Sequence, residues 1–205
     1  DDVHTVSIGL LYEQDLGSDF AVYGGPLLSW SGETGSEFGD GIGGGGLIGF
    51  RYRLRADLTI GAGLGVFFPP EDSEEFFPAI DIRWAITDDL VLSSRTTVVG
   101  TGGPGGLELQ YNYGNGWVAS VGFSILNRRF ALDDDGVAPN GYGEEESFPI
   151  YASLSYRPSR ATEIGIFGGV TFDNELTLED EGGNRILKDD GDPAPFAGVY
   201  GRVRF

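Results

Sequence analysis

The chain has no cysteine and no methionine among its 205 residues, and it has only one histidine and one lysine. The absence of cysteine excludes a disulfide framework and thiolate chemistry. The absence of methionine, an initiator included, predicts that the chain begins after a processing site and that a signal peptide has been removed. No run of about eighteen apolar residues occurs, which excludes a membrane-spanning helix.

Glycine and aromatic residues are abundant, whereas helix formers are scarce. Glycine supplies 35 of the 205 residues, and aromatic residues make up 13% of the chain. No window places apolar residues at i, i+3, i+4 and i+7, the spacing of an amphipathic helix. The length suits one domain. The sequence therefore predicts a single all-β domain over residues 1–205.

Acidic residues are segregated along the chain. The whole net charge of −19 lies in the stretches 33–40, 71–75, 133–146 and 173–192, and the remainder is neutral. Binding to nucleic acid needs clustered lysine and arginine, so we expect no nucleic-acid partner.

Strand-like runs of alternating residues follow one another through the sequence, separated by turn residues. Eleven such runs are predicted, at about 3–12, 20–31, 42–54, 58–68, 77–86, 90–99, 107–113, 117–130, 148–156, 162–172 and 195–205. Short connections alternate with long ones, and all four acidic stretches lie in long connections. This layout is typical of a bacterial outer-membrane barrel with short periplasmic turns and long extracellular loops.

The two faces of the predicted strands differ in chemistry. One face is apolar and carries no charge, as in the series Val6, Ile8, Leu10. The other is small and polar and carries the charged residues of the strands. Aromatic residues of the apolar face concentrate near both strand ends, as the interfacial girdles of a membrane barrel do. The pattern predicts an antiparallel transmembrane β-barrel with lipid outside and water inside.

The number of strands is left open by the sequence. Bacterial single-chain barrels have an even number of strands. We expect twelve, with one strand preceding Asp1 in the native chain, because "HTVSIGLLY" (4–12) is a good strand; the alternative is ten, with residues 1–12 outside the wall.

Several segments resemble an uncharacterised family of bacterial outer-membrane β-barrel proteins, DUF6268. The more specific segments are "RRFALDDDG" (128–136), "FPIYASLSYRPS" (148–159) and "DPAPF" (192–196). The resemblance implies a strand before the segment "DVHTV" (2–6), which favours twelve strands. It implies no activity and no catalytic residues.

Charged residues on the polar face are the candidate functional residues. These interior candidates are Arg51, Arg53, Asp81, Arg83, Arg95, Glu108, Arg128, Glu163, Arg202 and Arg204. Arginine–carboxylate pairs that cross the interior would plug it. A basic constriction beneath an acidic mouth would instead pass small solutes.

Two sequence features that suggest an enzyme or a nucleotide site are weak. His4 has no accompanying serine motif, so we expect no hydrolase and no other enzyme activity. The segment "GIGGGG" (41–46) fits G-x-G-x-x-G, but "LIGFRYRLR" (47–55) after it alternates as a strand. The interpretation we favour is a flexible entry into a strand, and we expect no cofactor.

Aspartate clusters suggest cation binding without matching a calcium loop. The candidate residues are Asp133, Asp134, Asp135, Asp189, Asp190 and Asp192. Weak binding of Ca²⁺ or Mg²⁺ is one prediction, and a solvated acidic surface is the other.

The sequence leaves two functions open. The first is a narrow, porin-like channel for small solutes. The second is a non-conducting barrel whose acidic loops engage a partner protein, a second copy of the chain or cation-bridged lipopolysaccharide. In either case Phe205, an outward aromatic at the C-terminus, resembles the signal by which outer-membrane barrels are recognised for assembly.

Overall fold

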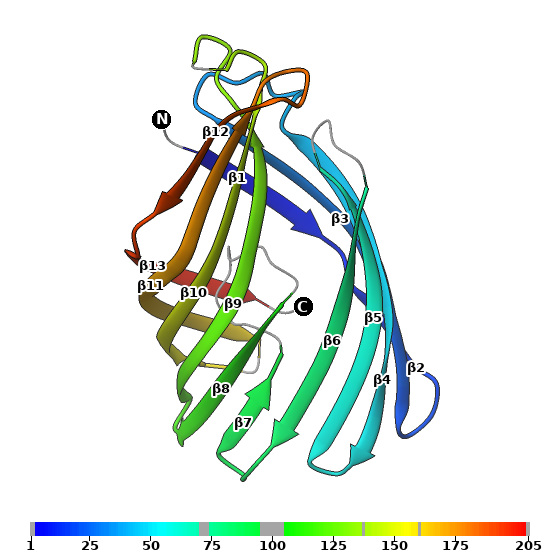
Figure 1. The fold of residues 1–205 in the computed structure, drawn as a ribbon. Coiled ribbons are helices and arrows are strands. Elements are labelled where there is room, and N and C mark those ends of the chain that lie inside the picture. Colours follow the sequence, from blue (N-terminus) through cyan, green and yellow to red (C-terminus); the bar gives the residue numbers. More distant parts are fainter. Residues whose placement is uncertain (1–2, 70–73, 95–104, 137, 160, 204–205) are drawn as a thin grey trace.

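The computed structural model describes residues 3–69, 74–94, 105–136, 138–159 and 161–203 (Figure 1). Strands make up 75% of these residues, and they contain no helix. No helix capable of crossing a membrane is therefore found in the described ranges. The all-β prediction is confirmed.

Within the described ranges the strands form one 13-stranded sheet. They are β1 (Val3–Gly9), β2 (Tyr12–Asp15), β3 (Phe20–Glu33), β4 (Ile42–Arg55), β5 (Leu58–Phe68), β6 (Glu75–Ala85), β7 (Leu90–Ser93), β8 (Gly105–Gly114), β9 (Trp117–Ala131), β10 (Tyr142–Tyr156), β11 (Thr162–Glu179), β12 (Arg185–Gly191) and β13 (Ala194–Val203). Each consecutive pair from β3 to β12 is antiparallel.

Strands β1 and β2 lie end to end along the same edge of β3. Both pair with β3 in the same register, from Val3 opposite Glu33 to Asp15 opposite Ala21. The interruption lies opposite Pro26, which has no N–H to donate to the ladder. The Leu10 N–H still donates to the Pro26 carbonyl at 3.0 Å. Strands β12 and β13 likewise follow β11 in one register, so the described strands trace eleven lines, as predicted.

A single parallel contact closes part of the sheet into a barrel. Gly32 of β3 pairs with Ala131 of β9, so β3 to β9 form a closed seven-strand barrel, with the other strands outside that ring. The Asp133 N–H also donates to the Glu33 carboxylate at 3.0 Å. In the described residues β1 pairs only with β3, and β13 only with β11. The sequence did not predict this contact between β3 and β9.

Short turns and longer loops lie at opposite ends of the sheet (Figure 1). The β8–β9 turn has left-handed backbone at Gly114, Asn115 and Gly116, with φ angles of 78°, 52° and 83°. Glycine and asparagine tolerate this conformation, which joins two antiparallel strands tightly. The connection therefore follows the predicted pattern.

The prediction of a long loop at 173–194 is wrong in part. Strand β11 continues to Glu179, and β12 pairs back onto it, with Leu178 opposite Leu187 and Thr177 opposite Lys188. Alternation in "ELTLE" (175–179) sustains the strand despite the surrounding acidic residues. Glu144, Glu145 and Glu146 similarly lie in β10, not in a loop.

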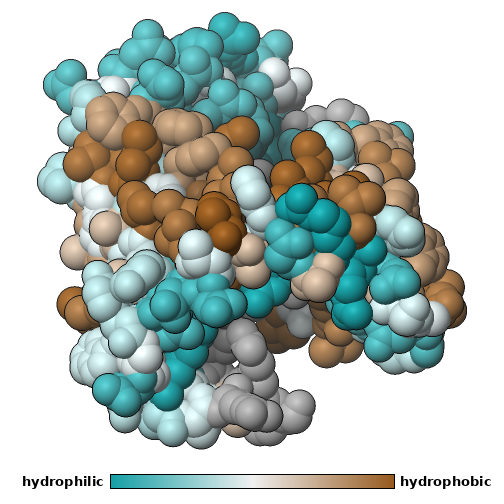
Figure 2. All heavy atoms as spheres, turned by 90° about the horizontal axis from the view of Figure 1, so that it is seen from below, coloured by the Kyte–Doolittle hydropathy of each residue, from teal (hydrophilic) through white to brown (hydrophobic). Residues whose placement is uncertain are grey.

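The outward face is apolar and exposed, while the inward face buries polar groups. Outward Val199 is 80% exposed, and outward Leu10 and Ile48 are each 71% exposed. Inward Glu108 and Asp81 are buried. Figure 2, which looks onto the turn end, shows hydrophobic side chains on the flanks and polar side chains between them. The predicted segregation of the two faces is confirmed.

Inward glycines provide space for aromatic rings from neighbouring strands. A Cβ atom at Gly49 would overlap the ring of Tyr23, and one at Gly65 would overlap Phe77. The same holds for Phe130 over Gly143. The sequence predicted a small inward face, but it did not show that interior aromatic rings occupy the space above these glycines.

Candidate lumen site

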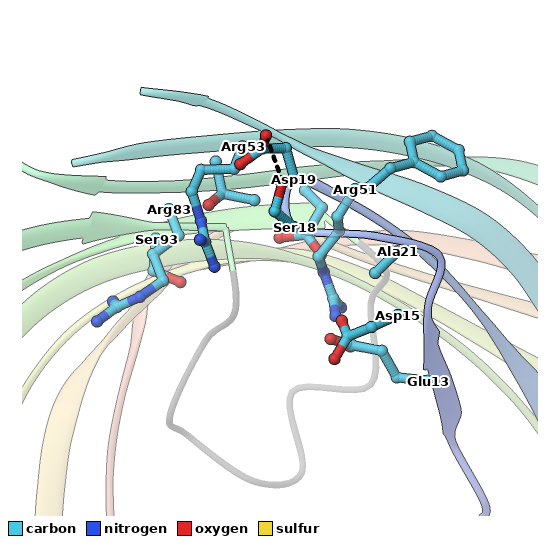
Figure 3. A pocket seen from close by; sticks show the side chains of 12 residues that line it. Glu13, Asp15, Ser18, Asp19, Ala21, Arg51, Arg53, Arg83 and Ser93 are labelled. Carbon is cyan, nitrogen blue, oxygen red and sulfur yellow. Dashed lines mark hydrogen bonds and ion pairs between the residues drawn. The ribbon is translucent and has the colours of Figure 1, made fainter. Parts of the chain in front are cut away.

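A polar pocket of about 300 Å³ lies inside the barrel near the turns (Figure 3). Strands β2 to β7 and the β2–β3 turn supply its walls. Its lining residues are Glu13, Asp15, Ser18, Asp19, Phe20, Ala21, Arg51, Arg53, Thr59, Asp81, Arg83 and Ser93. Four of the predicted interior residues, Arg51, Arg53, Asp81 and Arg83, therefore share one site.

Arg51 of β4 is neutralised within the pocket. Its guanidinium forms ion pairs with Glu13 of β2 and with Asp81 of β6, and it lies 4.3 Å from the centre of the Tyr23 ring. Gly61 of β5 lies in register between Arg51 and Asp81, and a Cβ there would be 3.2 Å from each of these side chains. The missing side chain lets Arg51 reach across β5.

Arg53 and Arg83 lie in the next row toward the turns. Thr59 of β5 is opposite Arg53 on one side and opposite Arg83 on the other. Both arginines are exposed to the interior, and neither forms an ion pair or side-chain hydrogen bond with any residue that the structure describes. With strands about 4.8 Å apart, the two Cα atoms are separated by roughly 10 Å.

Two further carboxylates from the start of the chain line the pocket, Asp15 in the row of Arg51 and Asp19 beside β4. Asp15 ends β2, and Asp19 lies in the following turn, where it accepts a hydrogen bond from the Ser18 hydroxyl at 2.9 Å. The Arg53 N–H donates to the Asp19 carbonyl at 2.7 Å, which fixes this turn beside β4. The pocket thus contains three arginines and four carboxylates, and its charge differs from the basic constriction that the sequence suggested.

The predicted residue Glu108 lies in a second interior cluster. It is fully buried and accepts hydrogen bonds from the Tyr151 hydroxyl at 2.9 Å and the Gln110 amide at 2.5 Å. Tyr151 of β10 reaches β8 across Gly122 of β9, where a Cβ would lie 2.9 Å from the tyrosine oxygen. The tyrosine fills this part of the interior.

Glu163 of β11 is held in a similar way. It accepts hydrogen bonds from Arg157 Nε at 3.1 Å and from the Tyr200 hydroxyl at 3.0 Å. The Tyr200 ring lies over Gly165, where a Cβ would be 2.6 Å from it. Among the described residues, Arg51–Asp81 is the pair that forms between predicted interior residues, whereas Glu108 binds Tyr151 and Glu163 binds Tyr200 together with Arg157.

Arg128 lies at the loop end, apart from the pocket. It pairs with Glu145 of β10, and its guanidinium is 5.7 Å from the centre of the Phe130 ring. Arg202 of β13 lies in register opposite Glu163 of β11. Arg95, Arg204 and Phe205 lie outside the described residues, so their predicted roles stay predictions.

The aspartate clusters occupy ordinary turn and strand positions. The Asp133 carboxylate accepts the Asp135 N–H at 3.0 Å, and Asp134 follows in the same turn. Asp189 and Asp190 lie in β12, and the carbonyl of Asp192 accepts a hydrogen bond from Asn174 at 2.7 Å. No group of three metal-ligating side chains is found among the described residues, and weak cation binding stays a prediction.

The remaining sequence motifs also have structural positions. His4 Nε2 lies 3.2 Å from the Thr34 hydroxyl. The glycine-rich segment 41–46 runs into β4, which begins at Ile42, and a strand follows it as expected. A dinucleotide site would require a helix at that point.

Sequence reasoning missed the carboxylates of β2 and its turn, and it missed the two interior tyrosines as functional partners. Glu13 and Asp15 continue the same period of two as Ser7 and Gly9, so extending the first run past Tyr12 would have placed them inside. Asp19 carries no such signal, because a turn has no fixed period.

Comparisons with known proteins found no relative of this chain. No protein-family model, no curated protein and no solved structure matches the chain.

Proposed function

We propose that the chain is an integral outer-membrane β-barrel that acts as a porin-like, narrow channel for small solutes. The observation that carries this proposal is the reversal of the faces: aliphatic side chains such as Val199 are exposed outside, and carboxylates such as Glu108 are buried inside. A soluble protein rarely exposes so large an apolar surface. A bilayer would cover it, and closed strands would satisfy the backbone.

Aromatic residues at the two strand ends support a bilayer position. Trp117 and Tyr156 pack with ring centres 5.1 Å apart beside the turns, and Trp30 stacks on Phe38 at 5.7 Å beside the loops. Such rings favour the membrane–water interface. In this arrangement the turns face the periplasm, and the acidic loops face the outside of the cell.

A twelfth strand is part of the proposal. β1 and β13 each have one paired side in the described residues, and a strand between them would complete an even-numbered wall. The resemblance to the DUF6268 family points in the same direction.

Conductance across a planar bilayer tests the channel directly. We expect small, steady open currents whose ion selectivity changes when Arg83 in the pocket is replaced by glutamate. Silence at all voltages from correctly folded protein would overturn the channel.

Contacts between β3 and β9 at the loop end favour the second function, a non-conducting interaction barrel. The Gly32–Ala131 contact and the Asp133–Glu33 hydrogen bond join β3 to the end of β9 there, next to the buried cluster of Phe130, Leu132 and Ala138. In this alternative the acidic loops bind a partner protein, a second copy or cation-bridged lipopolysaccharide. Neutralising residues 133–146 would then abolish capture of that partner while the bilayer stays silent.

A further inference from the structure

Besides the ion pairs of Arg51, the turn-end pocket contains two arginines and two aspartates that form no ion pair with another described residue. Arg51 is satisfied by Glu13 and Asp81. Arg53 and Arg83 then remain on the wall formed by β4 and β6, and Asp15 and Asp19 remain on β2 and its turn. Figure 3 shows these side chains around one hollow.

We propose that this pocket binds a small zwitterion, an amino acid or a short peptide with free termini. Arg53 and Arg83 would hold the carboxylate, and Asp15 and Asp19 would hold the ammonium group. The inference names a solute class for the proposed channel and rests on it for the route of entry. Binding itself requires the folded barrel and not conduction.

Charge matching favours a zwitterion over an ion of one sign. A simple anion would satisfy the two arginines but leave the two aspartates facing a like charge, and a simple cation would do the reverse. Arg53 and Arg83 flank Thr59 in one row, so a carboxylate between them would also relieve repulsion between two like charges. Arginine forms bidentate contacts with carboxylates.

The size and polarity of the pocket suit such a solute. A volume of about 300 Å³ corresponds to about ten water molecules at ~30 Å³ each. Glycylglycine has a similar number of non-hydrogen atoms. The hydroxyl group of Thr59 also lines the pocket and would bind the peptide amide.

Calorimetric titration of the detergent-solubilised barrel tests this inference. The probes are glycylglycine, N-acetylglycine, which has only the negative charge, and glycinamide, which has only the positive charge. We expect glycylglycine to bind about tenfold more tightly than either singly charged probe, because each of those probes lacks one set of charge-assisted hydrogen bonds. Equal binding of all three probes, or no binding of any, would overturn the inference.

Two variants assign the two ends of the solute. Arg83→Gln should weaken glycylglycine and N-acetylglycine but not glycinamide, and Asp15→Asn should weaken glycylglycine and glycinamide but not N-acetylglycine. Arg55→Gln is the matched control, because Arg55 is exposed and pairs with Asp57 outside the pocket lining. If both pocket variants behave like this control, the site is elsewhere and the inference fails.

The two proposals fail in different experiments. A bilayer that stays silent while glycylglycine binds selectively would overturn the channel alone. A conducting barrel that does not distinguish the three probes would overturn the zwitterion site alone.

Discussion

Two regions on the inward face of the sheet use the same structural device with different results. The arginine wall is formed by β4, β5 and β6, and the tyrosine wall by β8, β9, β10, β11 and β13. In both, an inward glycine lets a long side chain cross a neighbouring strand: Arg51 crosses Gly61, and Tyr151 crosses Gly122.

The difference lies in what remains after the crossing. On the tyrosine wall, aromatic rings fill the space, and their hydroxyl groups donate hydrogen bonds to Glu108 and Glu163. On the arginine wall, the pairing of Arg51 leaves Arg53 and Arg83 exposed to a cavity. The tyrosine wall therefore has a filled inward face, whereas the arginine wall borders an open pocket.

The largest expected effect is on the tyrosine wall. Gly122→Val should displace Tyr151 from Glu108 and destabilise the barrel by about 3 kcal/mol, through overpacking and a buried carboxylate that loses a donor. Thermal unfolding in detergent measures the change. Gly168→Ala is the control, because the nearest atom to its new Cβ would be the Phe196 carbonyl at an ordinary 3.4 Å. Equal stability of the two variants would contradict the filled-wall description.

A smaller loss is expected when the ion pairs of the arginine wall are broken. Arg51→Met leaves the buried Asp81 without this cation and should lower the free energy of unfolding by about 2 kcal/mol, since Asp81 lines an open pocket, which moderates the cost. The double variant Arg51→Met/Asp81→Leu should recover most of that loss. Chemical denaturation of the two proteins gives the comparison, and no recovery would show that Asp81 depends mainly on other partners.

The sequence predicted the strands and faces well because both follow the period of two. The alternation Val6, Ile8, Leu10 and the inward row of Arg51 and Arg53 required only that rule. Contacts across the interior could not be predicted in the same way. They depend on which residues lie in register on different strands, and register is a property of pairing that no single segment encodes.

The loop end also contains pairings that the sequence did not predict. A hydrophilic stretch such as 173–194 was expected to be a loop, but its alternation pairs Leu178 with Leu187 in a hairpin. The contact between Gly32 and Ala131 joins segments about a hundred residues apart, and no local pattern in the sequence indicates it.

Ion selectivity compares the two walls directly. Arg83→Glu should shift the cation-to-anion permeability ratio toward cations by about fivefold or more, because charges a few ångströms apart interact by ~1 kcal/mol even in water. Tyr200→Phe on the tyrosine wall changes no charge and should leave the ratio unchanged. Reversal potentials under a salt gradient provide the measurement. An equal shift in both variants would mean that permeant ions do not distinguish the walls.

The smallest expected effect lies outside both walls, at Asp180 in the β11–β12 turn. The Asn184 backbone N–H, donating at 2.8 Å, is the main favourable contact that holds the pKa of this carboxyl below its ordinary value, and the Asn184 side-chain amide and Gly182 N–H add to it. A lowered pKa means that the carboxylate stabilises the turn above the ordinary aspartate pKa, and that this stabilisation is lost as the pH falls through the lowered value.

Amide proton shifts of Gly182 and Asn184 during an acid titration would follow this change. Their midpoint should lie below the ordinary value of about 3.9, and the transition should disappear in Asp180→Ala. Global unfolding should be unaffected, because the hydrogen bonds of this side chain stay within the β11–β12 turn and reach neither wall. If the whole barrel loses stability with the same midpoint, the loop-end hairpin is coupled to the walls, and the distinction between the filled tyrosine wall and the open arginine wall would need to include the loops.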